Sequence, residues 1–321
     1  MAHLANSLAS PEQLFRRGTL NSLPSDLLDA IFFSAQCLTQ AAGLLLQLPQ
    51  SVTAQANVLL ARFWLVEPVM SHEFSDASAA AVYLVAKMGP SPRPPRDVVY
   101  VYTYLLSRSS PLFRPAAPAP ENDPSSYYLT DAAYQAARAR LLAAEARILY
   151  ALGFDTHVAL PHPLAVTYLQ ALDFLDQGPA ACEEGGLARR AIAYLGTALL
   201  SPQMLYLTHQ PNALAVAAVY NAARDVGAKM PECEWWEVFD VDREELGFLV
   251  VGMRSVEGWA ARMKSEAPGL KDGRMIARKD VEMEARKRGL QAGNGHEVVE
   301  DEETVLMRRM DERMAQAEST T

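Results

Sequence analysis

Apolar residues recur at intervals of three and four along most of the chain as far as Met263, which is the spacing of amphipathic helices. Proline, glycine and small polar residues interrupt this pattern at regular points and separate the helices. A first group of five helices is expected near residues 27–46, 52–65, 74–87, 96–106 and 131–152. A second group is expected near 164–175, 187–200, 211–226, 234–239 and 243–263. The pattern predicts an all-α fold, and residues 98–104 are assigned to a helix although their composition alone would favour a strand.

The stretch Phe74–Lys87 is predicted to be the central helix of the first group. Ser75 or Asp76 could cap its start, and the sequence Gly89-Pro90 prevents it from continuing far beyond Lys87. Alanines fill most of its faces, so neighbouring helices can approach it closely on several sides. A helix with this composition is expected in the middle of a bundle.

The chain repeats part of this helix. AAVYLVAK, from Ala80 to Lys87, returns as AAVYNAAR, from Ala217 to Arg224, with five of eight positions identical and an offset of 137 residues. That offset suits two tandem copies of a five-helix domain and is too long for a solenoid repeat. We therefore predict a flexible N-terminal arm at 1–20, two helical domains at 21–155 and 156–265, and a charged tail at 266–321.

The predicted tail differs in composition from the rest of the chain. Its 56 residues contain ten Lys/Arg and thirteen Asp/Glu, and no aromatic residue follows Trp259. Such a segment has too few large apolar side chains to build a core, so we expect it to be largely disordered or partly helical and solvated. Residues 107–127, rich in proline and serine, are expected to form a surface loop.

The overall charge and cysteine content narrow the classes of partner. A net charge of −9 argues against direct binding to nucleic acid or to an anionic membrane surface. Three dispersed cysteines suit a reducing compartment and form neither a disulfide framework nor a zinc motif. No signal peptide is predicted at the N-terminus, and no apolar run is expected to reach the length of a membrane span.

No catalytic motif is present in the sequence: it lacks a phosphate-binding glycine loop, a zinc-protease motif, a nucleophile elbow and the kinase motifs. His157 and His162 could be metal ligands, but without further ligands at suitable spacing we favour a turn between two domains. We expect neither a cofactor nor a metal.

A few other residues allow two interpretations. Trp235-Trp236 could form an exposed binding platform, but a short helix buried against the second core is favoured. The runs Arg16-Arg17 and Arg286-Lys287-Arg288 could be nuclear-import patches or, more simply, solvated faces. On composition alone, Lys87 is a cation at a helix end and Glu145 a surface carboxylate.

Several ordered motifs resemble the cyclin family, and within it the cyclin L branch. The segment QAAGLLLQLPQ, from Gln40 to Gln50, resembles the end of the first helix of that branch. The later motifs are Arg62-Phe63, then Pro92-Arg93 with Arg96-Asp97-Val98, then AEARILYALGF from Ala144 to Phe154, and then His157-Val158 with Pro161-His162. The similarity runs from about Ser22 to Met263 and implies two tandem cyclin boxes.

The resemblance implies a regulatory subunit without chemistry of its own, which binds and activates a cyclin-dependent Ser/Thr kinase. In this family the end of the central helix and the fifth helix hold the mobile helix of the kinase. Lys87 and Glu145 match the contact lysine and glutamate, and Met88, Leu149 and Phe154 would supply an apolar floor. The resemblance also implies a nuclear protein that acts in RNA polymerase II transcription, with pre-mRNA splicing as a further process.

Two departures from the family pattern separate this chain from longer cyclin L proteins. Gly89-Pro90 stands where the family usually has two glutamates, and the tail has no arginine–serine repeats. An alternative is therefore a cyclin-box scaffold that binds transcription-complex proteins without activating a kinase. Exposure of Lys87 and Glu145 on one patch would favour the kinase activator, whereas burial of Glu145 would favour the scaffold.

Overall fold

The computed structural model describes residues 5–21, 23–107, 109–110, 123–174, 186–266 and 275–290. Within these ranges the chain is helical and contains no strand. The first group of helices consists of α2 (Ser25–Leu45), α3 (Gln50–Val66), α4 (Phe74–Met88), α5 (Pro95–Leu106) and α6 (Asp131–Ala151). The second consists of α7 (Pro161–Ala171), α8 (Leu187–Leu199), α9 (Leu205–Thr208), α10 (Pro211–Val226) and α11 (Arg243–Glu266). Helices α1 (Pro11–Asn21) and α12 (Arg278–Lys287) flank the two groups.

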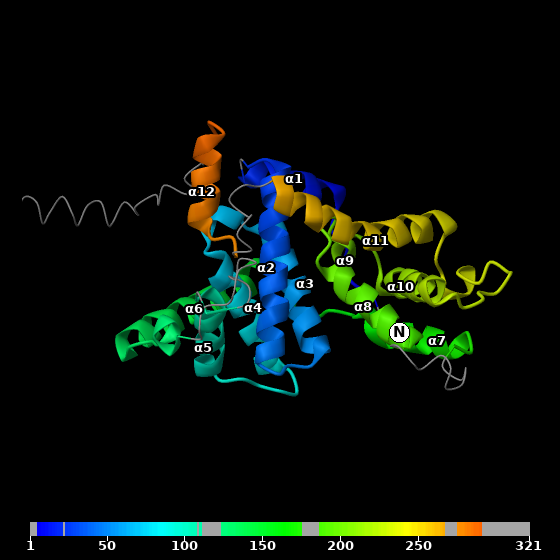
Figure 1. Ribbon diagram of the computed structural model, residues 1–321, viewed down its shortest axis with the longest axis horizontal. Coiled ribbons are helices and arrows are strands. Elements are labelled where there is room, and N and C mark those ends of the chain that lie inside the picture. Colours follow the sequence, from blue (N-terminus) through cyan, green and yellow to red (C-terminus); the bar gives the residue numbers. More distant parts are fainter. Residues whose placement is uncertain are drawn as a thin grey trace, which may run out of the picture.

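The all-α prediction is confirmed, and the repeated segment lies in the central helix of each group. Helix α4 packs against α2, α3, α5 and α6, and α10 packs against α7, α8 and α11 (Figure 1). The buried residues of both helices are mostly alanine and valine, which permit this close packing on several sides. Neither Ser75 nor Asp76 caps α4, because the helix begins at Phe74, before both of them, and its N-cap position is Glu73.

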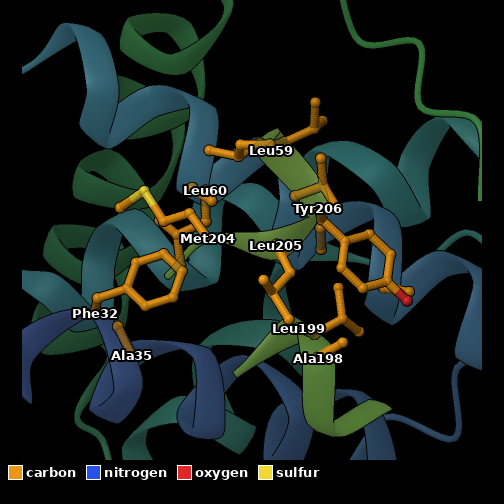
Figure 2. Packing of buried hydrophobic residues seen from close by; sticks show 14 of the residues in the cluster. Phe32, Ala35, Leu59, Leu60, Ala198, Leu199, Met204, Leu205 and Tyr206 are labelled. Atoms are coloured by element: carbon orange, nitrogen blue, oxygen red, sulfur yellow. The ribbon is translucent and has the colours of Figure 1, made fainter. Parts of the chain in front are cut away.

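The interface between the two groups is apolar and continuous with both cores. Helix α3 packs against α8 and α9. Figure 2 shows Phe32 and Leu60 from the first group in the same cluster as Met204 and Leu205 from the second. The predicted domain boundaries near 155 and 265 stay predictions, since the buried cluster spans both units.

Three buried hydroxyl groups connect α2, α4 and α5 inside the first core. Ser78 lies between Thr39 and Tyr102, with oxygen–oxygen distances of 2.7 Å on each side. Burial raises the pKa of the Tyr102 hydroxyl above its usual range. The chain of hydrogen bonds satisfies groups that would otherwise be costly to bury.

The described part of the N-terminal arm, which begins at residue 5, packs on the helices, whereas its sequence predicted a loose segment. Residues 11–21 form α1, and the preceding residues attach to the second group of helices. Asn6 exchanges two hydrogen bonds of 2.8 Å with the backbone of Ala159, and the Ala9 N–H donates to the Leu207 carbonyl at 2.7 Å. Arg17 is not on a solvated face either, because it pairs with Asp29 and is largely buried. These long-range contacts could not be read from local composition.

Three further expectations required adjustment. Helix α2 is long and apolar enough to cross a membrane by length and composition, although 61% of its most apolar window is buried as in a core helix. The predicted helix at 234–239 is reduced to a 3-10 turn, η6 (Glu237–Phe239), and Trp235 beside it is buried, as the favoured interpretation expected. In the predicted surface loop, residues 111–122 lie outside the described residues, while Ser109 is buried and bonds to Asp123.

The crossing of α2 and α3 gives a testable stability prediction. A Cβ atom added to Gly43 would lie 2.3 Å from Thr53 Oγ1 and 2.6 Å from Thr53 Cγ2. Thr53 is buried and β-branched, so it has little room to rotate away. Gly43→Ala should lower the free energy of unfolding by about 1–3 kcal/mol, measured by urea denaturation.

The matched control for Gly43 is Gly196 in α8. A Cβ atom there would meet no atom within 4 Å, so Gly196→Ala should raise stability by up to about 1 kcal/mol through its higher helix propensity. Adding Thr53→Ala to Gly43→Ala should restore most of the stability that the clash of the added methyl group with Thr53 removes. Equal effects of the two glycine substitutions would refute the close crossing.

Candidate functional site

The candidate site begins at the C-terminal end of α4, where Lys87 meets Glu145. Lys87 is in the last turn of α4, and its side chain is 48% exposed. Its ammonium group forms an ion pair with the Glu145 carboxylate from α6 and lies 5.5 Å from the centre of the Tyr83 ring. The two residues that were singled out from the sequence are therefore direct partners.

Glu145 is buried, so only Lys87 meets the condition of exposure that would favour the kinase activator. Residues Leu141, Glu145 and Ile148 are the buried positions of α6 and are spaced by four and three, which makes them one stripe facing the neighbouring helices. The interpretation of Glu145 as a surface carboxylate is wrong for the same reason. A carboxylate at 6% exposure needs a charged partner, and Lys87 supplies it.

Exposed or partly exposed apolar side chains occur next to Lys87 at the end of α4 and at the end of α6. Met88 is 49% and Phe154 is 63% exposed, whereas Leu149 is partly buried against the core. Tyr150, which no motif in the sequence singled out, is 74% exposed and packs edge-on against Phe154 with ring centres 5.7 Å apart. The apolar group Met88, Leu149, Tyr150 and Phe154 is hereafter called the apolar patch.

The end of α6 determines where Phe154 lies. The Gly153 N–H donates to the Tyr150 carbonyl at 3.1 Å, and the Phe154 N–H donates to the Leu149 carbonyl at 2.9 Å. These two bonds form a Schellman motif and bring the backbone of Phe154 back beside Leu149. Gly153 has φ 57°, as expected for a glycine after a helix, but Phe154 also has φ 62°. A bulky residue in the left-handed region is uncommon and costs free energy.

Helix α3 holds the segment that follows α6. The Gln55 side-chain amide donates to the Thr156 carbonyl at 2.9 Å, and the Arg62 guanidinium donates to the His157 carbonyl at 2.7 Å. Thr156 also contacts the sulfur of Met88, with an Oγ1–Sδ distance of 3.7 Å. The apolar patch therefore rests on α3, α4 and α6 together, which limits its movement.

The two histidines that follow, His157 and His162, were candidate metal ligands. No group of three or more His, Cys, Asp or Glu residues that could hold a metal ion occurs within the described ranges. The backbone of His157 makes two hydrogen bonds: its carbonyl accepts from Arg62, and its N–H donates to Asp155 Oδ1. The ring nitrogens of His162 are buried without a hydrogen-bond partner, and burial lowers the pKa of this imidazole to about 4.

The buried His162 predicts a loss of stability in acid. Its folded-state pKa of about 4 is below the unfolded value near 6.5, so the unfolded chain binds the proton more readily between these values. The contribution of His162 to stability is complete above pH 6.5 and declines as the pH falls toward 4, with a slope of at most about 1.4 kcal/mol per pH unit.

The measurement compares urea denaturation of the wild type and of His162→Leu at several pH values. Burial also lowers the pKa of His72 and His209, so only the difference between the two proteins isolates His162. Parallel curves for the two proteins from pH 7 to pH 4 would show that His162 is solvated.

Comparison with known proteins identifies relatives. The chain is 31% identical to human cyclin-L2 over 260 residues, which cover 80% of this chain and 45% of that protein. It is 32% identical to chicken (Gallus gallus) cyclin-L1 over 211 residues, which cover 65% of this chain and 36% of that protein. The chain thus spans less than half the length of these curated relatives. No protein-family profile matches it.

Solved structures share the fold. One is a chain of the yeast RNA polymerase II CTD kinase CTDK-1 complex, with a TM-score of 0.61 and 13% identity over 90% of this chain and 86% of that chain. Another is a chain of the CAK complex from Chaetomium thermophilum bound to ATP-γ-S, with a TM-score of 0.57 and 16% identity over 92% and 94% of the two chains. At these identities the similarity shows the fold alone.

Proposed function

The chain is a homologue of the L-type cyclins, and we propose that it is a regulatory subunit that binds and activates a cyclin-dependent Ser/Thr kinase. It has no catalytic residues of its own in this proposal. In this proposal it acts in transcription by RNA polymerase II in the nucleus, and pre-mRNA splicing is a further process in which it acts. A related fold in a kinase complex named for the RNA polymerase II CTD supports this choice of process.

The observation that carries the proposal is the apolar patch beside Lys87. Exposed aromatic residues on a firmly supported surface are typical of the centre of a protein interface. Met88, Tyr150 and Phe154 would contact the apolar side of the kinase helix, and Lys87 would reach the backbone carbonyls or an acidic side chain at its edge. The strained backbone of Phe154 is consistent with a position kept for binding.

Glu145 has a different role in this proposal from the one implied by the resemblance. It is buried under Lys87 and would act mainly by holding the lysine in place. The burial of Glu145 also favours the alternative, a scaffold that binds transcription-complex proteins without activating a kinase. A test must therefore measure both kinase binding and kinase activity.

The test compares Phe154→Asn with Tyr128→Asn in the full chain. Asparagine tolerates a positive φ, so Phe154→Asn removes the ring and keeps the turn. Tyr128 is 75% exposed and precedes α6, which is 21 residues or about 30 Å long, so it lies far from the apolar patch. Each tagged protein is purified from cells, its partners are identified by mass spectrometry, and kinase activity is measured on an RNA polymerase II CTD repeat peptide.

We expect the wild type and Tyr128→Asn to retain a cyclin-dependent kinase with CTD activity. For Phe154→Asn, both the amount of kinase recovered and the CTD activity should fall at least tenfold. Circular dichroism should show that both variants remain folded. Recovery of transcription proteins without a kinase would contradict the activator proposal and support the scaffold. Normal kinase recovery with folded Phe154→Asn would show that the apolar patch is not part of the kinase interface.

A further inference from the structure

Residues 275–290, which we call the strap, lie against the first group of helices although they follow the second group in the sequence (Figure 1). This segment includes α12 and was expected to be solvated because of its charge. Instead, its apolar residues join the main core: Val281 is 3% and Ala285 is 0% exposed, and Met275 and Ile276 are also buried. The surface that they cover consists of the first half of α2 and the start of α4.

Polar contacts fix both ends of the strap on this surface. At one end, the Ile276 N–H donates to Ser34 Oγ at 3.2 Å, and the Arg278 N–H donates to Glu73 Oε1 at 3.4 Å. Arg278 is the first residue of α12, so Glu73 places a carboxylate at the N-terminus of that helix, where negative charge is favourable. At the other end, Arg288 forms an ion pair with Asp26 at 2.6 Å.

The surface under the strap therefore has the form of a helix-binding groove. Acidic residues Glu73 and Asp26 mark its two ends. Apolar residues of α2 and α4 lie beside each end, with Ala35, Leu38 and Phe74 near Glu73 and with Leu27 and Ala30 near Asp26. It fits a helix that carries apolar residues on one face and an arginine near its C-terminal end.

Among the described residues, the strap leaves space in this groove near each of its ends. A cavity of about 290 Å³ lies beside Met275, Ile276 and Ala277, with Leu38, Phe74 and Leu106 on the groove side. A second cavity of about 290 Å³ lies next to Arg288 and has a mixed lining, with Leu27, Ala30, Trp259 and Met263 beside the charged residues Asp26 and Arg262. The cavity beside Met275 is mainly apolar, so an occupant with larger apolar side chains could make more contacts there.

We propose that the strap is a displaceable internal ligand, which closes the groove on α2 and α4 to an amphipathic helix of a partner protein. That external helix would have the same arrangement of charges as the strap and bulkier apolar residues. The inference is independent of the proposed kinase binding. The groove lies at the start of α4, and Lys87 is about 20 Å away near the other end of that helix, so both surfaces could be occupied together.

The experiment uses the full chain and a fluorescein-labelled peptide that corresponds to residues 275–290. Val281→Asp in the chain puts a charge on the buried face of α12 and should release the strap. The matched control is Met283→Asp on the same helix, because Met283 is 55% exposed and its replacement should leave the strap in place. Binding of the peptide is followed by fluorescence anisotropy, and the fold by circular dichroism and thermal unfolding.

We expect the peptide to bind the Val281→Asp chain at least tenfold more tightly than the wild type or the Met283→Asp chain, because the tethered strap competes at a high effective concentration. A second substitution in the released chain, Asp26→Arg, should weaken binding, and a peptide carrying Arg288→Glu should restore it. This restoration would show that the peptide uses the same groove as the strap.

Two results would overturn the proposal: no binding of the peptide to a folded Val281→Asp chain, or equal binding to all three chains. If Val281→Asp does not fold, the double variant Arg278→Glu/Arg288→Glu takes its place, since it opposes both acidic ends of the groove and leaves every buried apolar residue unchanged.

Discussion

Lys87→Glu is expected to lower the free energy of unfolding by about 2 kcal/mol as well as to abolish kinase binding. From the sequence alone this substitution should leave the fold unchanged, because charges at helix ends usually have small effects. The structure changes the expectation, because Lys87 neutralises a buried carboxylate. Removing one partner of a fully buried ion pair costs about 3–5 kcal/mol, and the half-exposed side chain of Lys87 reduces this value.

The control for this prediction is the double variant Lys87→Gln/Glu145→Gln. Two amides can form a hydrogen bond in the same place without a buried charge, so its stability should be close to that of the wild type. Kinase binding should still fall at least tenfold, because the cation at the edge of the apolar patch is lost. Stability is measured by urea denaturation and binding by pull-down. Wild-type stability of Lys87→Glu would mean that Glu145 has another partner or is solvated.

The pairing of Lys87 with Glu145 shows how far the sequence could predict the site. The resemblance to cyclins selected both residues, and the structure brings them together. The burial of Glu145 was missed, although Leu141, Glu145 and Ile148 have the spacing of a buried stripe. Helix α6 is so rich in alanine and arginine that this stripe is weak, and packing against α3, α4 and α5 determines which face is buried.

The helices themselves were predictable because their period and breaks are local features of the sequence. Helix α10 has the expected bounds, and α8 ends one residue before its predicted end. The N-terminal arm and the strap were not predictable in the same way. Asn6 and Arg288 are held by Ala159 and Asp26, more than 150 residues away in the chain, and no local pattern contains that information.

The second large effect is expected in the repeated central helices. Ala81 in α4 and Ala218 in α10 occupy corresponding positions of the repeat, and both have 0% exposure. Leucine at either position would force neighbouring helices apart, and overpacking of this kind costs about 1–3 kcal/mol or more. Ala146→Leu on the exposed face of α6 is the matched control and should change stability by less than about 0.5 kcal/mol.

These two variants also test whether the repeats unfold separately. The buried cluster runs without interruption from the first group of helices into the second, and the arm and the strap bridge distant parts of the chain. Both Ala81→Leu and Ala218→Leu should therefore shift a single cooperative transition, with the same midpoint by circular dichroism and by tryptophan fluorescence. If each substitution moves only one of two separate transitions, the repeats are independent folding units, and the apolar interface of Phe32 and Leu60 with Met204 contributes little to stability.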